Sequence, residues 1–226
     1  YTYGGLQSQS LAGGQLRFGN SVEAFSDIVA LSQKAIGALP ADSRIGIAPH
    51  SLRATSQSDL REALDLHAGM PVHIHIAEQA KEVEEVRALR GARPVEWLLA
   101  HHEVTEKWCL IHATHMTEAE TVALAESGAV AGLCPITEAN LGDGIFNGGR
   151  YLAHGGTFGI GSDSNVNISL TEELRTLEYS QRLRDQQRNV MVSASGSVGE
   201  SLYFGAAKGG AQALNREAGR IEVGAL

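Results

Sequence analysis

The feature that most constrains the fold is a regular alternation of short apolar runs with longer helix-forming stretches. Each run is rich in Ile, Val and Ala and apolar on both faces, which is typical of buried parallel strands. The runs are residues 44–51, 71–78, 108–115, 129–135 and 157–163. The predicted helices are residues 20–39, 56–68, 79–101, 117–127, 171–188 and 198–214. Serial βα units predict an α/β fold with a parallel sheet.

Polar, chemically capable residues stand at the carboxyl ends of four of these runs. They are His50, Glu78, His112 with His115, and Asp163. In a (β/α)₈ TIM barrel all strand ends meet at one site, whereas an open sheet brings together only the strands beside its switch point. The barrel is therefore favoured. Because a barrel needs eight strands and the sequence offers five, we expect a partial barrel of about strands 4–8.

Composition excludes several classes of partner. The 226-residue chain carries a net charge of −8, which argues against nucleic acid and anionic membrane surfaces. No apolar run approaches the roughly 20 residues that span a bilayer, and no signal segment opens the chain. Cys109 and Cys134 lie inside apolar runs, as buried reduced thiols do. These features predict a cytoplasmic enzyme.

The run "PVHIHIAEQ" contains the densest group of candidate site residues. His73 and His75 share one face of the predicted strand, and His75 is nearer the carboxyl end, which favours it as a metal ligand. Glu78 follows within reach of a water held by that histidine. The alternative is two core histidines bonded to backbone groups, with Glu78 a carboxylate at a helix start.

Three further motifs add candidates. In "LIHATH", His112 could orient a water or stabilise an anion, whereas His115 is assigned to loop structure. In "GIGSDSN", Asp163 could ligate a metal and accept a proton from its water, or simply cap a turn. In "APHSLR", His50 and Arg53 could bind substrate, the Arg53 fork suiting a carboxylate, although a surface ion pair is the alternative.

Two other segments are less informative. The polar stretch 137–146 is predicted to be a loop, in which Glu138, Asn140 and Asp143 either contact substrate or satisfy turns. The glycines at 155, 156, 159 and 161 do not form G-x-G-x-x-G, so a phosphate cradle is not expected.

The order of these motifs resembles the amidohydrolase superfamily, and within it the mononuclear zinc aminohydrolases. The resemblance runs from "RFGNSVEAF" to "GGAQALNREAGRIEVG" and includes "GAVAGLCPITEANLGDGIF" and "EELRTLEYSQRLRD". It implies a metal-dependent hydrolase that deaminates N-formimidoyl-L-glutamate to N-formyl-L-glutamate and ammonia in histidine degradation.

The resemblance also implies a role for each candidate. His75 and Asp163 would hold Zn²⁺, one per site, although other divalent metals are possible. Glu78 would be the proton shuttle, and His112 would polarise the attacked carbon or the water. His50 and Arg53 would bind the small acidic substrate, with Arg53 gripping its carboxylate. The protein is expected to be a homodimer.

The sequence departs from the family pattern at both ends. The family's N-terminal His-x-His pair is missing from it. Residues 1–215 are expected to be the partial barrel and residues 216–226 the start of a return to a small β-sandwich domain. Two protein ligands hold catalytic zinc poorly, so this chain alone is expected to be inactive.

Two alternative functions remain open. The first is a ring aminohydrolase of the same superfamily, acting on guanine, cytosine or a triazine. The second is a non-catalytic barrel fragment that serves as a binding or scaffold module.

Overall fold

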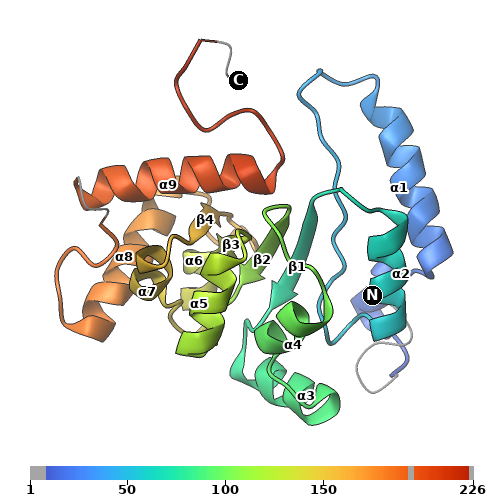
Figure 1. The fold of residues 1–226 in the computed structure, drawn as a ribbon, viewed down its shortest axis with the longest axis horizontal. Coiled ribbons are helices and arrows are strands. Elements are labelled where there is room, and N and C mark those ends of the chain that lie inside the picture. Colours follow the sequence, from blue (N-terminus) through green and yellow to red (C-terminus); the bar gives the residue numbers. More distant parts are fainter. Residues whose placement is uncertain (1–8, 193–195, 224–226) are drawn as a thin grey trace.

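Four parallel strands form the central sheet of the computed structural model, which describes residues 9–192 and 196–223 (Figure 1). They are β1 (Val72–Ile76), β2 (Trp108–His112), β3 (Val130–Leu133) and β4 (Thr157–Ile160). The spatial order β1-β2-β3-β4 follows the chain without reversal, with His75 paired to Ile111 and Ile111 to Gly132. This unreversed order is that of consecutive barrel strands and contains no switch point.

The predicted strand at 44–51 is wrong as a regular strand. The segment runs along β1 but touches it only through two isolated parallel bridges, Ile47 to Val72 and Ser51 to His75. Pro49 between these bridges has no N–H to donate, which interrupts a regular ladder. The segment nevertheless brings His50 beside β1, because the His50 carbonyl accepts the His75 N–H at 3.0 Å.

The predicted helices are present, with one split and two additions. The helices are α1 (Val22–Ile36), α2 (Gln57–Leu66), α3 (Ala80–Arg90), α4 (Pro94–His101), α5 (Glu118–Glu126), α6 (Pro135–Leu141), α7 (Gly148–Ala153), α8 (Leu170–Asp185) and α9 (Val198–Ala213). A 3₁₀ helix covers Gly13–Phe18. The single helix predicted at 79–101 is wrong, because Gly91 ends α3 with φ of 77° and Pro94 begins α4.

Helix α6 corrects the first part of the loop predicted at 137–146, and α7 follows that loop. Helix α6 starts at Pro135, a residue suited to the first helical turn, and ends at Leu141, followed by Gly142 with φ of 71°. Seven residues are too few to show a helical repeat of apolar positions, so the sequence pattern did not reveal this helix.

The core lies between the sheet and the helices that pack on it. Its largest fully buried side chains include Tyr151, Phe146 and Phe158. Helix α9 lies across β3 and β4, and Gly209 permits this approach because a Cβ there would lie 1.9 Å from the Phe158 carbonyl oxygen. Cys109 and Cys134 are buried and unpaired, as predicted.

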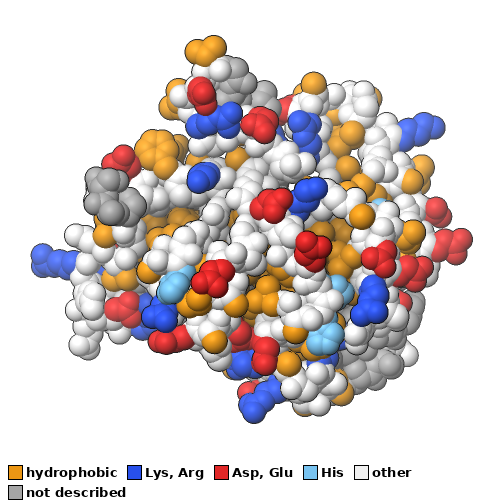
Figure 2. Space-filling model, in the orientation of Figure 1, with side chains coloured by type: hydrophobic (Ala, Val, Ile, Leu, Met, Phe, Trp, Pro, Cys, Tyr) orange, Lys and Arg blue, Asp and Glu red, His pale blue; other side chains and the backbone are white. Residues whose placement is uncertain are grey.

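The surface and the carboxyl-terminal segment contribute little to the assignment of the fold. Acidic and basic side chains are interspersed over the face shown in Figure 2. Among residues 9–192 and 196–223, no helix is long and apolar enough to cross a membrane. Residues 216–223 form neither helix nor strand, and 224–226 lie outside the described residues, so the proposed sandwich boundary stays a prediction.

Candidate active site

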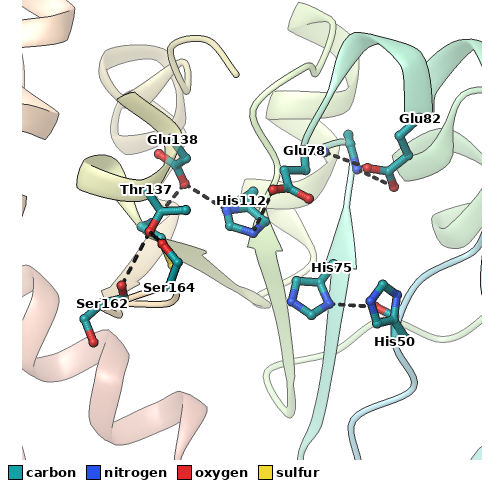
Figure 3. Close-up of polar contacts among 11 residues, drawn as sticks. His50, His75, Glu78, Glu82, His112, Thr137, Glu138, Ser162 and Ser164 are labelled. Carbon is teal, nitrogen blue, oxygen red and sulfur yellow. Dashed lines mark hydrogen bonds and ion pairs between the residues drawn. The ribbon is translucent and has the colours of Figure 1, made fainter. Parts of the chain in front are cut away.

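Side chains from three strand ends converge at one edge of the sheet. Candidate ligand atoms of His75, His112 and Asp163 all lie within 4.8 Å of one another. His75 is on β1, His112 ends β2, and Asp163 follows β4. Glu78, just after β1, faces His112 (Figure 3), with Oε1 of Glu78 3.7 Å from Nε2 of His112. The predicted convergence of strand ends is therefore present.

The two histidines of β1 have different hydrogen-bond partners. The His75 Nδ1–H donates to the His50 carbonyl at 2.8 Å, which leaves Nε2 as the nitrogen with a lone pair. A backbone carbonyl on the second nitrogen is the usual support for a metal-binding imidazole. His73 instead bonds through Nε2 to the Ala213 carbonyl at 2.9 Å, near the end of α9. His73 is thus a half-buried histidine bonded to the backbone, and His75 alone of the pair lies among the candidate metal donors.

Glu78 is held by a carboxylate that the sequence analysis did not select. Buried Glu82, in the first turn of α3, accepts the N–H of Ala77 at 3.1 Å and of Glu78 at 2.9 Å. Ala77 has φ of 50°, so the chain turns sharply between strand and helix. Burial raises the pKa of the Glu78 carboxyl, an effect that nearby His112 partly offsets. A raised pKa suits a group that gives up a proton near neutral pH.

His112 is bonded on one nitrogen and faces the site with the other. Its Nδ1–H donates to Oε1 of Glu138 at 3.2 Å. Burial lowers the pKa of His112, but the hydrogen bond to Glu138 and the charge of Glu78 outweigh this and leave the pKa raised. Cys134 is near enough that His112, Cys134 and Glu138 also form a group of potential metal donors. The hydrogen bonds of Glu138 to His112 and to the Cys134 N–H account for that proximity.

Asp163 lies in an exposed loop that α6 supports. Its φ of 45° is in the left-handed region, which aspartate tolerates better than most residues. The Thr137 hydroxyl lies 2.9 Å from the Ser164 hydroxyl and donates to the Ser162 carbonyl at 3.4 Å (Figure 3). Helix α6 therefore contacts His112 through one residue and the Asp163 loop through its neighbour.

His50, one of the predicted substrate residues, lies beside His75 on the side away from His112 (Figure 3). The rings of His50 and His75 are 4.9 Å apart, and burial together with the proximity of His75 lowers the pKa of His50 to about 4. A pocket of about 440 Å³ opens beside both histidines. Its lining includes Phe18, Phe25 and Asp59.

Arg53 lies in the turn after His50 and is not among the residues lining this pocket. It is half-buried and lies 3.6 Å from Glu85 on α3, as in the ion-pair alternative. Arg90 donates to the carbonyls of Leu52 and Thr55, which fixes the turn that carries Arg53.

The remaining candidates are structural or peripheral. His115 bonds through Nε2 to the Asp143 carbonyl at 2.6 Å, in keeping with its predicted loop role. Asp143 is buried, whereas Asn140 is exposed on α6.

The donor set fits zinc. Zn²⁺ is an ion of borderline softness that binds imidazole nitrogen and carboxylate oxygen, and the other ring nitrogen of His75 is already bonded to a backbone carbonyl. The described residues therefore supply up to three donors to one metal ion.

Comparison with known proteins places the chain in a family. The model of the amidohydrolase family matches residues 23–226. The chain belongs to this family. Its relatives include a formimidoylglutamate deiminase from Pseudomonas aeruginosa, 47% identical over 99% of this chain and 49% of the relative. A 5-methylthioadenosine/S-adenosylhomocysteine deaminase from Halobacterium salinarum is 35% identical over 82% of this chain and 43% of the relative.

Solved structures agree with the amidohydrolase assignment. An amidohydrolase from Brucella melitensis matches with a TM-score of 0.93 and 49% identity, over 97% of this chain and 49% of that one. An adenosine deaminase from Xanthomonas campestris with bound zinc matches with a TM-score of 0.70 and 26% identity, over 78% and 40%. The chain spans about half the length of these relatives. Its fold is an α/β fold that matches part of an amidohydrolase (β/α)₈ barrel.

Proposed function

We propose that the full-length protein hydrolyses N-formimidoyl-L-glutamate to N-formyl-L-glutamate and ammonia, as a zinc-dependent enzyme of histidine degradation. The observation that carries the proposal is the convergence of His75, His112 and Asp163 within 4.8 Å, with Glu78 facing His112. The similarity to a formimidoylglutamate deiminase over 99% of this chain supports the choice of substrate.

His75 and Asp163 are the residues proposed to hold zinc. When bound, the ion would lower the pKa of a water toward about 7 and so make hydroxide available at neutral pH. Asp163, at the edge of the site, takes the proton of the attacking water. His112 stands opposite Glu78 and polarises the attacked carbon or orients the water.

Glu78 delivers the proton that lets the nitrogen depart as ammonia. Burial favours its protonated form, which is the form that can donate. Its backbone is anchored to Glu82, so the carboxyl is held at the side of the site where His112 lies. A positioned acid of this kind contributes roughly 10²–10⁴-fold to rate.

Arg53 and His50 are proposed to bind the acidic end of the substrate. The fork of Arg53 can take a carboxylate, and Arg90 keeps its turn fixed. In this proposal the substrate carboxylate competes with Glu85 for the guanidinium. Placement in the cytoplasm, supported by the two buried unpaired thiols, and a homodimeric state remain predictions.

Ring deamination is the second candidate. The pocket beside His50 and His75 includes Phe18 and Phe25, which could stack on a base. The deaminase from Halobacterium salinarum adds support from sequence. A scaffold role without catalysis is a third reading, and weak zinc binding by the 226-residue chain alone remains an expectation.

Ammonia release by the zinc-loaded full-length protein separates these functions. The substrates are N-formimidoyl-L-glutamate, guanine, cytosine, a triazine and 5-methylthioadenosine. We expect turnover of the first, and a large rise in KM for it on Arg53→Ala. Preferred turnover of a ring substrate would replace the proposal, and no turnover of any would favour the scaffold reading.

A further inference from the structure

Glu138 is a buried carboxylate placed between two N–H groups. Its side chain is 4% exposed. Oε1 accepts the backbone N–H of Cys134 at 2.9 Å and the Nδ1–H of His112 at 3.2 Å. Burying a carboxylate is costly unless such bonds compensate it. The hydrogen bond from the Cys134 N–H fixes the Glu138 carboxylate to the start of α6. The carboxylate is therefore a fixed acceptor for the His112 imidazole.

His112 needs a support of this kind because its backbone leaves the strand at that residue. Its φ is 70° and that of Ala113 is 48°, both in the left-handed region that non-glycine residues rarely occupy. A residue in this region is strained and persists only where its surroundings hold it. The departure from strand geometry turns the ring toward α6 and Glu78 (Figure 3).

The hydrogen bond to Glu138 determines which ring nitrogen of His112 points into the site. With Nδ1–H donated to Glu138, Nε2 is the nitrogen presented to Glu78, 3.7 Å away. The His75 and His112 rings are stacked, with centroids 5.7 Å apart and planes at 23°. A flip of the His112 ring would move Nδ1 away from Glu138 and Nε2 away from Glu78. One tautomer and one ring orientation are selected together.

We infer that Glu138 is a positioning residue, which holds His112 in one tautomer and aims its Nε2 at the reacting atoms. Glu138 acts through His112 and contacts no substrate. The inference deepens the proposed function and rests on it for its kinetic readout. The tautomer readout is independent of the substrate.

The experiment compares Glu138→Ala with Glu138→Gln in the zinc-loaded full-length protein. Alanine removes the acceptor, whereas glutamine keeps an oxygen that both N–H groups can use. We expect Glu138→Ala to lower kcat by about 10–100-fold with KM little changed, as loss of an outer support does. Glu138→Gln should recover most of that loss. ¹⁵N spectra of the imidazoles, recorded at a pH where His112 is neutral, should show His112 as the Nδ1–H tautomer in wild type and Glu138→Gln, and as a mixture in Glu138→Ala.

Glu178→Ala is the matched control. Glu178 is 2% exposed and accepts the N–H groups of Val190 and Met191, all in α8 and the segment after it. The Glu178→Ala variant should lose about as much thermal stability as Glu138→Ala, but it should keep the wild-type kcat and His112 tautomer.

Three results would overturn the inference. They are an unchanged His112 tautomer in Glu138→Ala, a kcat loss in Ala no larger than in the control, or a Gln variant as impaired as Ala. If Glu138→Ala does not fold, Glu138→Asp replaces it, because the shorter side chain withdraws the acceptor from Nδ1 of His112, and an unchanged His112 tautomer in Glu138→Asp overturns the inference. If wild type does not turn over the substrate, the proposed function fails while the spectra still test Glu138.

Discussion

Glu78 and His112 face each other across the site, with Oε1 of Glu78 3.7 Å from Nε2 of His112. A carboxyl whose pKa is raised by burial, beside an imidazole, is suited to proton transfer. Glu78→Gln in the full-length protein should therefore lower kcat by about 10²-fold or more while zinc content stays the same. Glu84→Gln, an exposed change on the following helix α3, is the control. Turnover retained by Glu78→Gln would remove Glu78 from the mechanism.

Glu82 supports Glu78 through the backbone, so its loss should affect both stability and rate. In Glu82→Gln one of the two bonded N–H groups, of Ala77 or Glu78, would face an amide NH₂ instead of an oxygen. An unsatisfied buried donor costs about 1–3 kcal/mol. Urea unfolding should show a loss of this size, and kcat should fall because the Glu78 turn loosens. A kcat equal to that of wild type would show that the turn holds without Glu82.

Much of the site followed from the sequence, because parallel strands end at one edge of a sheet. That rule predicts that His75, Glu78, His112 and Asp163 lie close together, and the structure places their side chains so. It also separated His75 from His73 by position along β1, and the His73 bond to Ala213 agrees with that choice.

What the sequence could not reveal depends on contacts between distant segments. Glu138 meets His112 across 26 positions, and no local pattern marks that pair. The segment at 44–51 has strand-like composition, yet Pro49 prevents a regular ladder. Glu82 resembles any acidic residue in a first helical turn, and only the geometry of the Ala77 turn distinguishes it.

Thr137 connects α6 to the loop that carries Asp163, so its hydroxyl should matter for metal binding. Thr137→Val removes the contacts to Ser164 and Ser162, whereas Thr137→Ser keeps a hydroxyl. We expect Val to weaken zinc binding about 10–100-fold in competition with a chelator, and Ser to change it little. Equal zinc affinity in Val and wild type would show that the loop is held by other contacts.

His50 should stay neutral well below the usual pKa of histidine. In the metal-free protein its pKa is lowered to about 4, first by burial and then by His75. The unfolded chain binds this proton at about pH 6.5. Stability from this group is therefore present above pH 6.5 and is lost as the pH falls toward 4. NMR titration of the His50 ring checks the pKa, and a midpoint near 6.5 would contradict it.

Gly209 and Gly210 are adjacent in α9 but should respond oppositely to alanine. A Cβ at Gly209 would lie 1.9 Å from the Phe158 carbonyl oxygen on β4, whereas a Cβ at Gly210 meets nothing within 4 Å. Gly209→Ala must push α9 away from the sheet and should cost about 1–3 kcal/mol. Gly210→Ala should gain up to about 1 kcal/mol from helix propensity. Chemical denaturation of the two variants gives the comparison, and equal stabilities would mean that α9 does not lie this close to β4.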